Sequence, residues 1–225
     1  MSLELYLVRH GKTVFNTVGR LQGWSDSPLT PEGREVAENL GKGLARAGIG
    51  FDAAFSSVSP RASDTAHLIL NASGQQHLPL TTIEALREYC FGGLEGELTE
   101  IVHEKVMAAR NLPNVQAWLQ AYRHGSSNLI AESVSALDPL RLAETEAQFV
   151  SRLQRGLEEL VARSPANGRV LLVSHGMAIT AILKSIEPSS TLYQSVPNAS
   201  VTLLKHEQGI WHIQQVGDTS LIHHA

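Results

Sequence analysis

Two short apolar runs stand out in the pattern of hydrophobic and polar positions, because each ends abruptly in a histidine and a glycine. Residues 3–8 (LELYLV) precede Arg9-His10-Gly11, and residues 170–173 (VLLV) precede Ser174-His175-Gly176. Short apolar runs with polar and glycine boundaries predict buried strands. The carboxyl ends of parallel strands meet at one edge of a sheet, where ligands bind. The pattern therefore predicts two histidines and an arginine at one edge.

Helical and extended patterns alternate along most of the remaining chain. Thr30-Pro31-Glu32-Gly33 predicts the start of a helix that ends at Gly48, and Ser59-Pro60 predicts the start of another, which runs to about residue 71. The other expected elements are strands at 51–56 and 79–83, helices at 144–162 and 176–186, and a hairpin of 200–206 with 210–216. This rhythm predicts an α/β fold, a three-layer α/β/α sandwich with a mostly parallel sheet.

The alternation fails over residues 97–143. Helical patterns cover residues 99–110 and 114–124, and residues 125–139 are expected to form a mobile loop. We interpret this region as a helical cap insertion over the strand ends, within a single domain of residues 1–225. Insertions at that position often determine substrate specificity.

Composition and charge exclude several classes of function. The net charge is −4, and no run of Lys or Arg exceeds two residues, so neither nucleic acid nor a membrane surface is an expected partner. The single cysteine, Cys90, rules out an intramolecular disulfide and fits a reducing compartment. The first residues lack a secretory signal pattern, and no apolar stretch reaches the ~20 residues needed to span a bilayer. We expect a cytoplasmic protein.

Several chemically useful residues fall at predicted strand ends or helix starts. They are Arg9 with His10, Arg61, Glu88, and His175 with Gly176. Arginine side chains and helix N-termini both favour a dianionic phosphate. A histidine that is kept neutral by neighbouring cations is available as a nucleophile, and a nearby carboxyl group can protonate a leaving oxygen. The constellation indicates phosphoryl transfer.

Six sequence blocks then carry a resemblance to a known family. They are residues 7–16 (LVRHGKTVFN), 21–26 (LQGWSD), 29–33 (LTPEG), 56–62 (SSVSPRA) with Thr65-Ala66, 86–88 (LRE) and 173–176 (VSHG). In this order they resemble the histidine phosphatase superfamily, which includes the cofactor-dependent phosphoglycerate mutases. The resemblance covers most of the chain outside the cap and implies a phosphoglycerate mutase-like fold.

The resemblance also implies a role for each matching residue. His10 would become phosphohistidine, while Arg9, Arg61 and His175 would hold the transferring phosphoryl group. Glu88 would act as general acid toward the leaving oxygen and then as base toward water. The rest of the substrate-binding pocket would comprise Thr13, Asn16, Gln22, Gly23 and the backbone N–H of Gly176. No metal and no other cofactor is implied, because the arginines supply the positive charge.

Each of these residues also has a structural interpretation. A lone histidine after a strand is more often structural, and Glu88 alone could be a solvated loop carboxylate. Their joint occurrence with Arg9 and Arg61 favours catalysis. The other histidines lack the spacing and partners of a zinc site. We interpret Cys90 as a packed small hydrophobic residue.

Three functions remain open. The chain could be a metal-independent phosphatase for a small phosphate monoester, a phosphoglycerate mutase, or a non-catalytic module that binds phosphorylated ligands. A binding module needs neither His10 nor Glu88. A mutase must hold a second anionic group, and the mutase pattern resembles Glu-Arg-His-Tyr-Gly where this chain has Glu88-Tyr89-Cys90-Phe91-Gly92.

The cap also lacks an adjacent arginine pair, which disfavours a second anionic group. We expect an apolar pocket mouth instead, formed by Tyr89, Phe91, Leu94, Val106, Met107, Trp118 and Leu119. A phosphatase is therefore favoured, with a phosphorylated small molecule as its substrate. The sequence leaves the identity of that substrate open, and a homodimer is possible because the fold exposes sheet edges.

Overall fold

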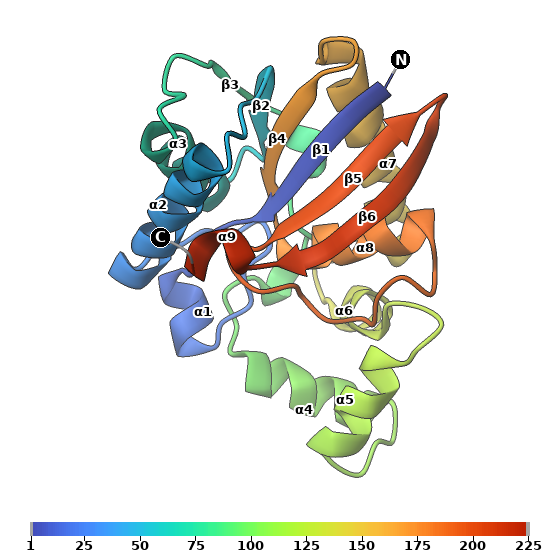
Figure 1. Ribbon diagram of the computed structural model, residues 1–225. Helices are drawn as coiled ribbons and strands as arrows, with labels where there is room; N and C mark the ends of the chain where they lie inside the picture. The colour runs from blue at the N-terminus through green and yellow to red at the C-terminus, as the bar shows by residue number, and fades with distance from the viewer. Residues whose placement is uncertain (1, 224–225) are drawn as a thin grey trace.

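A six-stranded sheet lies at the centre of the computed structural model, which describes residues 2–223 (Figure 1). The strand order is β3-β2-β4-β1-β5-β6. The four strands β1 to β4 are parallel, whereas β5 is antiparallel to both β1 and β6. The strands are β1 (Ser2–Arg9), β2 (Ala53–Ser56), β3 (Leu80–Thr82), β4 (Arg169–Ser174), β5 (Val201–Glu207) and β6 (Ile210–Asp218). The predicted mostly parallel sheet and the closing hairpin are confirmed.

Helices cover both faces of the sheet, which explains why β1 and β4 are almost continuously apolar. Leu5 and Leu172 belong to the hydrophobic core on one face, and Val8 and Val173 belong to the core on the other. Parallel strands that are buried on both faces require such runs. The covering helices are α2 (Pro31–Arg46), α3 (Pro60–Ala72) and α9 (Ser220–His223) on one face, and α7 (Glu146–Arg163) and α8 (Gly176–Ile186) on the other. The predicted three-layer sandwich is confirmed.

Helices α2 and α3 begin at the residues that the capping signals predicted. The side chain of Thr30 accepts a hydrogen bond from the Gly33 N–H, and Pro31 occupies the first turn of α2. Ser59 is the N-cap of α3 but makes no capping hydrogen bond with its side chain. A short helix, α1 (Val14–Val18), was not predicted; it begins with a capping box of Thr13 and Asn16.

The prediction of a mobile loop over 125–139 is wrong, because this segment contains helix α6 (Leu129–Leu137). Asn128 caps the helix by accepting a hydrogen bond from the Ala131 N–H, and Ala131 and Val134 are buried. The preceding Gly-Ser-Ser-Asn sequence reads as a loop, but asparagine is equally a helix-capping residue. Packing of α6 against α4 and α5 then decides in favour of the helix.

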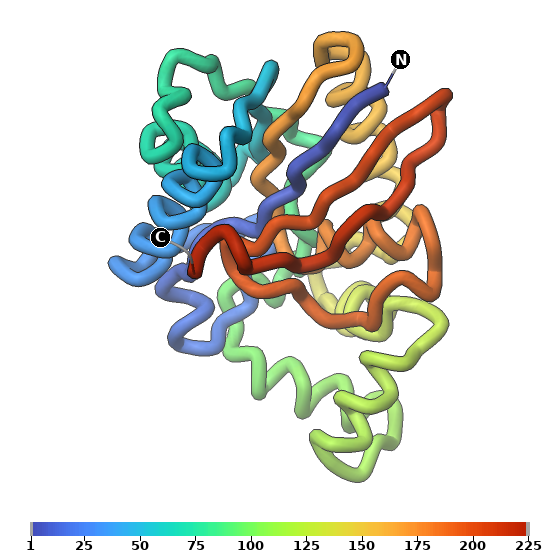
Figure 2. The backbone as a smooth tube through the Cα atoms, viewed as in Figure 1, coloured from blue at the N-terminus to red at the C-terminus, as the bar shows by residue number. Residues whose placement is uncertain are grey.

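The cap lies beyond the carboxyl ends of the parallel strands (Figure 1). Its predicted helices are confirmed as α4 (Thr99–Ala109) and α5 (Val115–Arg123). Figure 2 shows the chain leaving the sheet through α4 and returning through α6 before α7 begins. The carboxylate of Asp138 accepts hydrogen bonds from the N–H groups of Gly93 and Leu142, which fastens the end of the cap to the loop below. Within residues 2–223, no helix combines the length and apolarity needed to cross a membrane.

Candidate active site

Three parallel strands end at the same level and bring the predicted site residues together. Arg9 at the end of β1 lies opposite Ser174 at the end of β4, and Ser56 at the end of β2 lies opposite Val173. Backbone hydrogen bonds continue past the strand ends, since the His10 N–H donates to the Ser174 carbonyl at 3.0 Å. The sheet register therefore places the Arg9-His10 and Ser174-His175 segments side by side, as the sequence predicted.

His10 is held in one tautomer. Its Nδ1 lies 2.8 Å from the carbonyl oxygen of Gly11, which can only accept, so Nδ1 carries the proton and Nε2 keeps its lone pair. The side chain is buried. Burial, followed by the charges of Arg61 and Arg9, holds the pKa of His10 well below its usual value of 6.5. His10 is thus a neutral imidazole with a free basic nitrogen.

A group of buried nitrogen atoms around His10 has no hydrogen-bond partner among the described residues. These atoms are Nε of Arg9, Nε of Arg61, and both ring nitrogens of His175, whose ring centroid is 5.4 Å from that of His10. Burial and the charge of Arg61 also hold the pKa of His175 well below 6.5. Buried polar atoms are normally paired. The arrangement fits a ligand rich in acceptor oxygens.

Arg61 offers only its Nε–H to such a ligand. Its Nη1 donates to the carboxylate of Asp26 at 2.7 Å and to the Ser25 carbonyl at 2.8 Å. Its Nη2 donates to the carbonyls of Gly23 and Gln22, at 2.8 and 3.3 Å. Loop 22–26 therefore fixes the guanidinium plane and aims the remaining donor.

Glu95 holds that loop in place, and sequence reasoning missed it. Its carboxylate accepts hydrogen bonds from the N–H groups of Gly23, Trp24 and Ser25, at 2.7 to 3.1 Å, and from the Phe91 N–H at 2.9 Å. In the sequence, Glu95 lies in a glycine-rich stretch, where a carboxylate is expected to be a solvated loop residue. Its N–H partners in loop 22–26 are more than 65 positions away, so they become apparent only in the folded structure.

The carboxyl group of Glu88 is buried at the N-terminus of α8. Its Oε1 accepts hydrogen bonds from the N–H groups of Tyr89 and Ala178, and its Oε2 accepts one from Met177, all at 2.9 Å. Burial raises the pKa of Glu88, although these hydrogen bonds and the charges of Arg61 and Arg9 oppose the shift. A raised pKa suits a proton donor. Glu88 itself occupies much of the helix N-terminus where the sequence suggested a phosphate.

The predicted pocket residues differ in their availability to a ligand. Thr13 and Asn16 cap α1, and Gln22 Nε2 donates to Thr13 Oγ1 at 2.9 Å, so these side chains largely bind one another. A Cβ on Gly23 would overlap the Tyr89 carbonyl, and its N–H already binds Glu95. A Cβ on Gly176 would clash with Ser195 Oγ and approach Arg9 Nε to 3.3 Å, so the glycine brings α8 close to the unpartnered arginine nitrogen.

Comparison with known proteins decides the family. The model of the histidine phosphatase superfamily (branch 1) matches residues 5–219. The chain belongs to this superfamily. The predicted family is therefore confirmed.

Its superfamily relatives include both mutases and phosphatases. A 2,3-bisphosphoglycerate-dependent phosphoglycerate mutase of Hamiltonella defensa is 30% identical over 197 residues, covering 82% of this chain and 77% of the relative. A broad-specificity phosphatase of Saccharomyces cerevisiae is 30% identical over 224 residues, covering 96% and 86%. The crystal structure of a phosphoglycerate mutase from Bacillus anthracis superimposes with a TM-score of 0.91 at 36% identity, covering 99% of this chain and 96% of that one. The phosphoglycerate mutase-like fold is thus confirmed.

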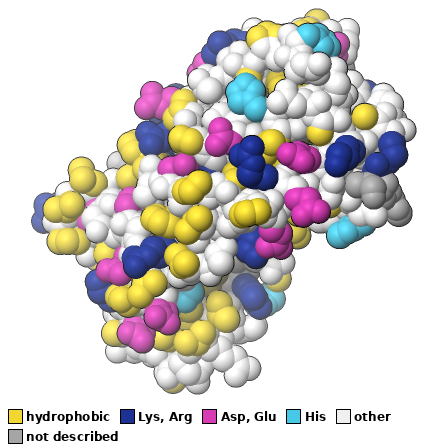
Figure 3. Space-filling model, turned by 90° about the vertical axis from the view of Figure 1, so that its left-hand side faces the viewer, with side chains coloured by type: hydrophobic (Ala, Val, Ile, Leu, Met, Phe, Trp, Pro, Cys, Tyr) yellow, Lys and Arg dark blue, Asp and Glu magenta, His cyan; other side chains and the backbone are white. Residues whose placement is uncertain are grey.

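The prediction of an apolar pocket mouth is wrong in its residues. Tyr89, Phe91 and Leu94, together with Val106 and Trp118 of the cap helices, are buried in one hydrophobic core, and Met107 and Leu119 pack against that core. The exposed apolar side chains within three positions of site residues are instead Val14, Val18, Trp24 and Val58, which are 37% to 50% exposed. Figure 3 shows hydrophobic side chains gathered in the middle of the face on the side of α1 to α3.

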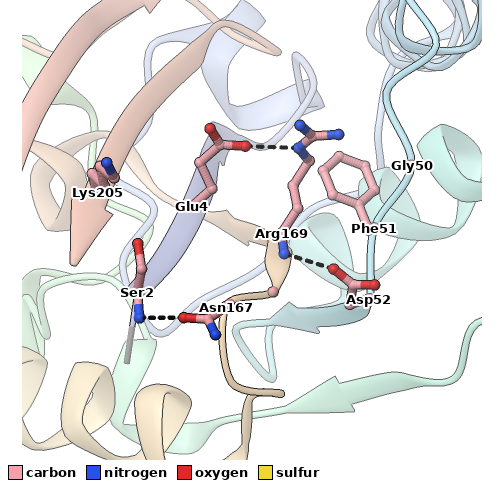
Figure 4. A pocket seen from close by; sticks show the side chains of 9 residues that line it. Ser2, Glu4, Gly50, Phe51, Asp52, Asn167, Arg169 and Lys205 are labelled. Atoms are coloured by element: carbon pink, nitrogen blue, oxygen red, sulfur yellow. Dashed lines mark hydrogen bonds and ion pairs between the residues drawn. The ribbon is translucent and has the colours of Figure 1, made fainter. Parts of the chain in front are cut away.

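A hollow of about 570 Å³ lies at the opposite end of the sheet and does not share the features of the superfamily site (Figure 4). Its charged groups neutralise one another, because Arg169 binds Glu4 through Nε at 2.8 Å and Lys205 binds Glu207 at 2.8 Å. The Asp52 carboxylate accepts the Arg169 N–H. The histidine-bearing edge of the sheet is therefore the better candidate for chemistry.

Proposed function

We propose that this chain is a metal-independent phosphatase that hydrolyses phosphate monoesters of small molecules through a phosphohistidine at His10. The supporting observation is the group of four buried, unpartnered nitrogens beside a neutral histidine. A transferring phosphoryl group presents three equatorial oxygens, which can accept from the Nε–H groups of Arg9 and Arg61 and from the N–H of His175. Positioning and charge stabilisation of this kind supply most of the catalysis in phosphoryl transfer.

The reaction would proceed in two steps. His10 Nε2 attacks phosphorus while the bond from phosphorus to the leaving oxygen breaks, and Glu88 donates its proton to that oxygen. The alcohol departs and leaves a phosphohistidine. Glu88, now a carboxylate, takes a proton from water, whose oxygen attacks phosphorus while the bond from phosphorus to nitrogen breaks. Inorganic phosphate is released, and both His10 and Glu88 return to their initial states.

The mutase alternative needs a second anion site, and two sets of donors that could contribute to one, in loop 22–26 and in the cap, already bind carboxylates. The N–H groups of Gly23, Trp24 and Ser25 bind the Glu95 carboxylate. In the cap, Arg110 binds Glu132 and Ser133. Their engagement supports transfer to water and a leaving group without a second strong negative charge.

A substrate panel tests the proposal. Turnover of p-nitrophenyl phosphate and of phosphorylated metabolites is measured with a chelator present, for the wild type and His10→Ala. We expect wild-type turnover that vanadate inhibits and that His10→Ala lowers by more than about 10³-fold. Interconversion of phosphoglycerates with 2,3-bisphosphoglycerate, at a rate above hydrolysis, would instead support the mutase. Phosphate-ester binding without turnover of any ester would support the binding module.

The acid role of Glu88 predicts a dependence on the leaving group. Glu88→Gln cannot donate the proton, so we expect a loss of about 10²-fold on alkyl phosphates and a much smaller loss on aryl phosphates, whose leaving oxygens need less protonation. The rates are compared on p-nitrophenyl phosphate and on a matched alkyl monoester. An equal loss on both would remove Glu88 from the acid role.

A further inference from the structure

A buried ion pair behind the Glu88 loop takes no part in the proposed chemistry. Arg152 on α7 binds Glu144 through Nε and Nη2, with both nitrogen–oxygen distances at 2.6 Å. The two side chains are only 12% and 13% exposed. A buried pair of this kind is weak evidence for stability by itself, because both charges lose their hydration. Its other contacts indicate a more specific role.

The remaining hydrogen bonds of Arg152 all go to the backbone of residues 85–88. Nη1 donates to the carbonyls of Ala85 and Arg87, at 2.9 and 3.0 Å, and Nη2 donates to the carbonyl of Glu88 at 3.0 Å. The planar guanidinium is therefore saturated by one carboxylate and three carbonyls in a fixed geometry. A lysine could not reproduce this pattern.

Glu144 holds the other side of the same loop. Its Oε2 accepts a hydrogen bond from the Cys90 N–H at 3.0 Å, and its own N–H donates to the Cys90 carbonyl at 3.1 Å. The pair thus fixes the backbone both before and after Glu88. Glu144 is also the residue that follows the cap region, so the pair joins the base of the cap to the loop that carries the acid.

We propose that Arg152, oriented by Glu144, is the positioning residue that sets the carboxyl group of Glu88 in line with the leaving oxygen. The proposal rests on the proposed phosphatase function. Arg152 touches the backbone of Glu88 and not its carboxyl group, which is bound by the N–H groups of Met177 and Ala178. Its removal allows the loop to shift relative to α8 and moves the acid away from the oxygen that it must protonate.

The effect is expected to depend on the leaving group. Displacement of a catalytic group by ~1 Å can cost about 10²-fold, so Arg152→Met should lower alkyl phosphate turnover by about that factor and aryl phosphate turnover by less than about 5-fold. The matched control is Arg155→Met, an exposed arginine on the same helix that donates to Ser151 Oγ. It should change neither rate.

Two further variants separate positioning from a general structural role. The double variant Arg152→Met/Glu144→Gln removes both charges, so that no unpaired buried carboxylate remains to destabilise the fold. We expect it to lose the same alkyl phosphate turnover as Arg152→Met alone. In Glu88→Gln, adding Arg152→Met should cause no further loss on alkyl phosphate, because the displaced group no longer donates a proton. Arg152→Lys should recover only part of the alkyl rate.

Equal losses on both substrates, or a full additional loss in the Glu88→Gln background, would overturn the positioning role while leaving the phosphatase function intact. Wild-type protein without turnover of any phosphate ester would overturn the phosphatase function and this inference with it. Circular dichroism and thermal unfolding of every variant show that the rates compare folded proteins.

Discussion

His10 owes its state to the residues that surround it. The Gly11 carbonyl fixes the proton on Nδ1, and the Arg61 and Arg9 charges add to burial in keeping the ring neutral. The sequence predicted the histidine and the arginines, because they follow recognisable strand and helix signals. It could not predict the tautomer, since that depends on a backbone carbonyl whose direction is set by the turn after β1.

These surroundings predict the pH dependence of turnover. The pKa of His10 is lowered, so the nucleophile stays neutral as the pH falls, and kcat/KM on an aryl phosphate should persist below pH 6.5 after correction for titration of the substrate. The pKa of Glu88 is raised, so alkyl phosphate turnover should decline as the pH rises through that higher value. Rate profiles from pH 4 to 9 on both substrates test this. An acid limb at or above 6.5 on the aryl substrate would contradict it.

Loop 22–26 shows how an element without regular structure can shape a site. Its carbonyls bind Arg61, and its N–H groups bind Glu95, so both polar edges of the loop backbone are used. The sequence signalled the neighbouring helices through Pro31 and Pro60. The sequence could not predict the geometry of this loop, because Glu95, which binds its N–H groups, and Asp26, which binds Arg61 from within the loop, look like ordinary acidic residues until the fold brings these groups together.

Glu95→Gln tests the importance of this loop. A glutamine has one acceptor oxygen, and its NH₂ group would face the loop N–H groups, donor against donor. The loop should therefore loosen, and Arg61, which its carbonyls hold, should lose its fixed position. We expect kcat/KM to fall by about 10-fold on aryl and alkyl phosphates alike, since phosphate positioning serves both. Steady-state kinetics measure the change, with Glu100→Gln, an exposed carboxylate in the first turn of α4, as the control. Unchanged kinetics in Glu95→Gln would show that the loop does not depend on this carboxylate.

At the scale of the whole molecule, the apolar runs predicted the layers of the fold. They did not predict the contacts between residues far apart in the sequence. Strands buried on both faces need apolar residues at nearly every position, so β1 and β4 could be predicted from the sequence. The Arg152 side chain, in contrast, binds carbonyls 64 to 67 positions away, and nothing in its local sequence signals them. The α6 helix was missed for a similar reason, since packing within the cap decides its conformation.

The unpartnered nitrogens predict that phosphate stabilises the folded protein. A ligand that binds only the native state at 100 times its Kd adds about 2.7 kcal/mol to the free energy of unfolding. Inorganic phosphate or vanadate should therefore raise the melting temperature in a concentration-dependent way. Thermal unfolding at constant ionic strength measures this. Arg9→Met should abolish the shift, and Arg34→Met, on the exposed side of α2, should retain it; a shift retained in Arg9→Met would place the anion elsewhere.

The central claim is that His10 carries the phosphoryl group, and trapping the intermediate tests it most directly. The protein is mixed with a fast aryl phosphate, quenched in alkali within milliseconds, digested at neutral to alkaline pH and analysed by mass spectrometry. We predict one acid-labile phosphate per chain, located on His10 and missing from His10→Ala. Phosphate found on another residue, or turnover without any phosphoenzyme under these conditions, would contradict the account.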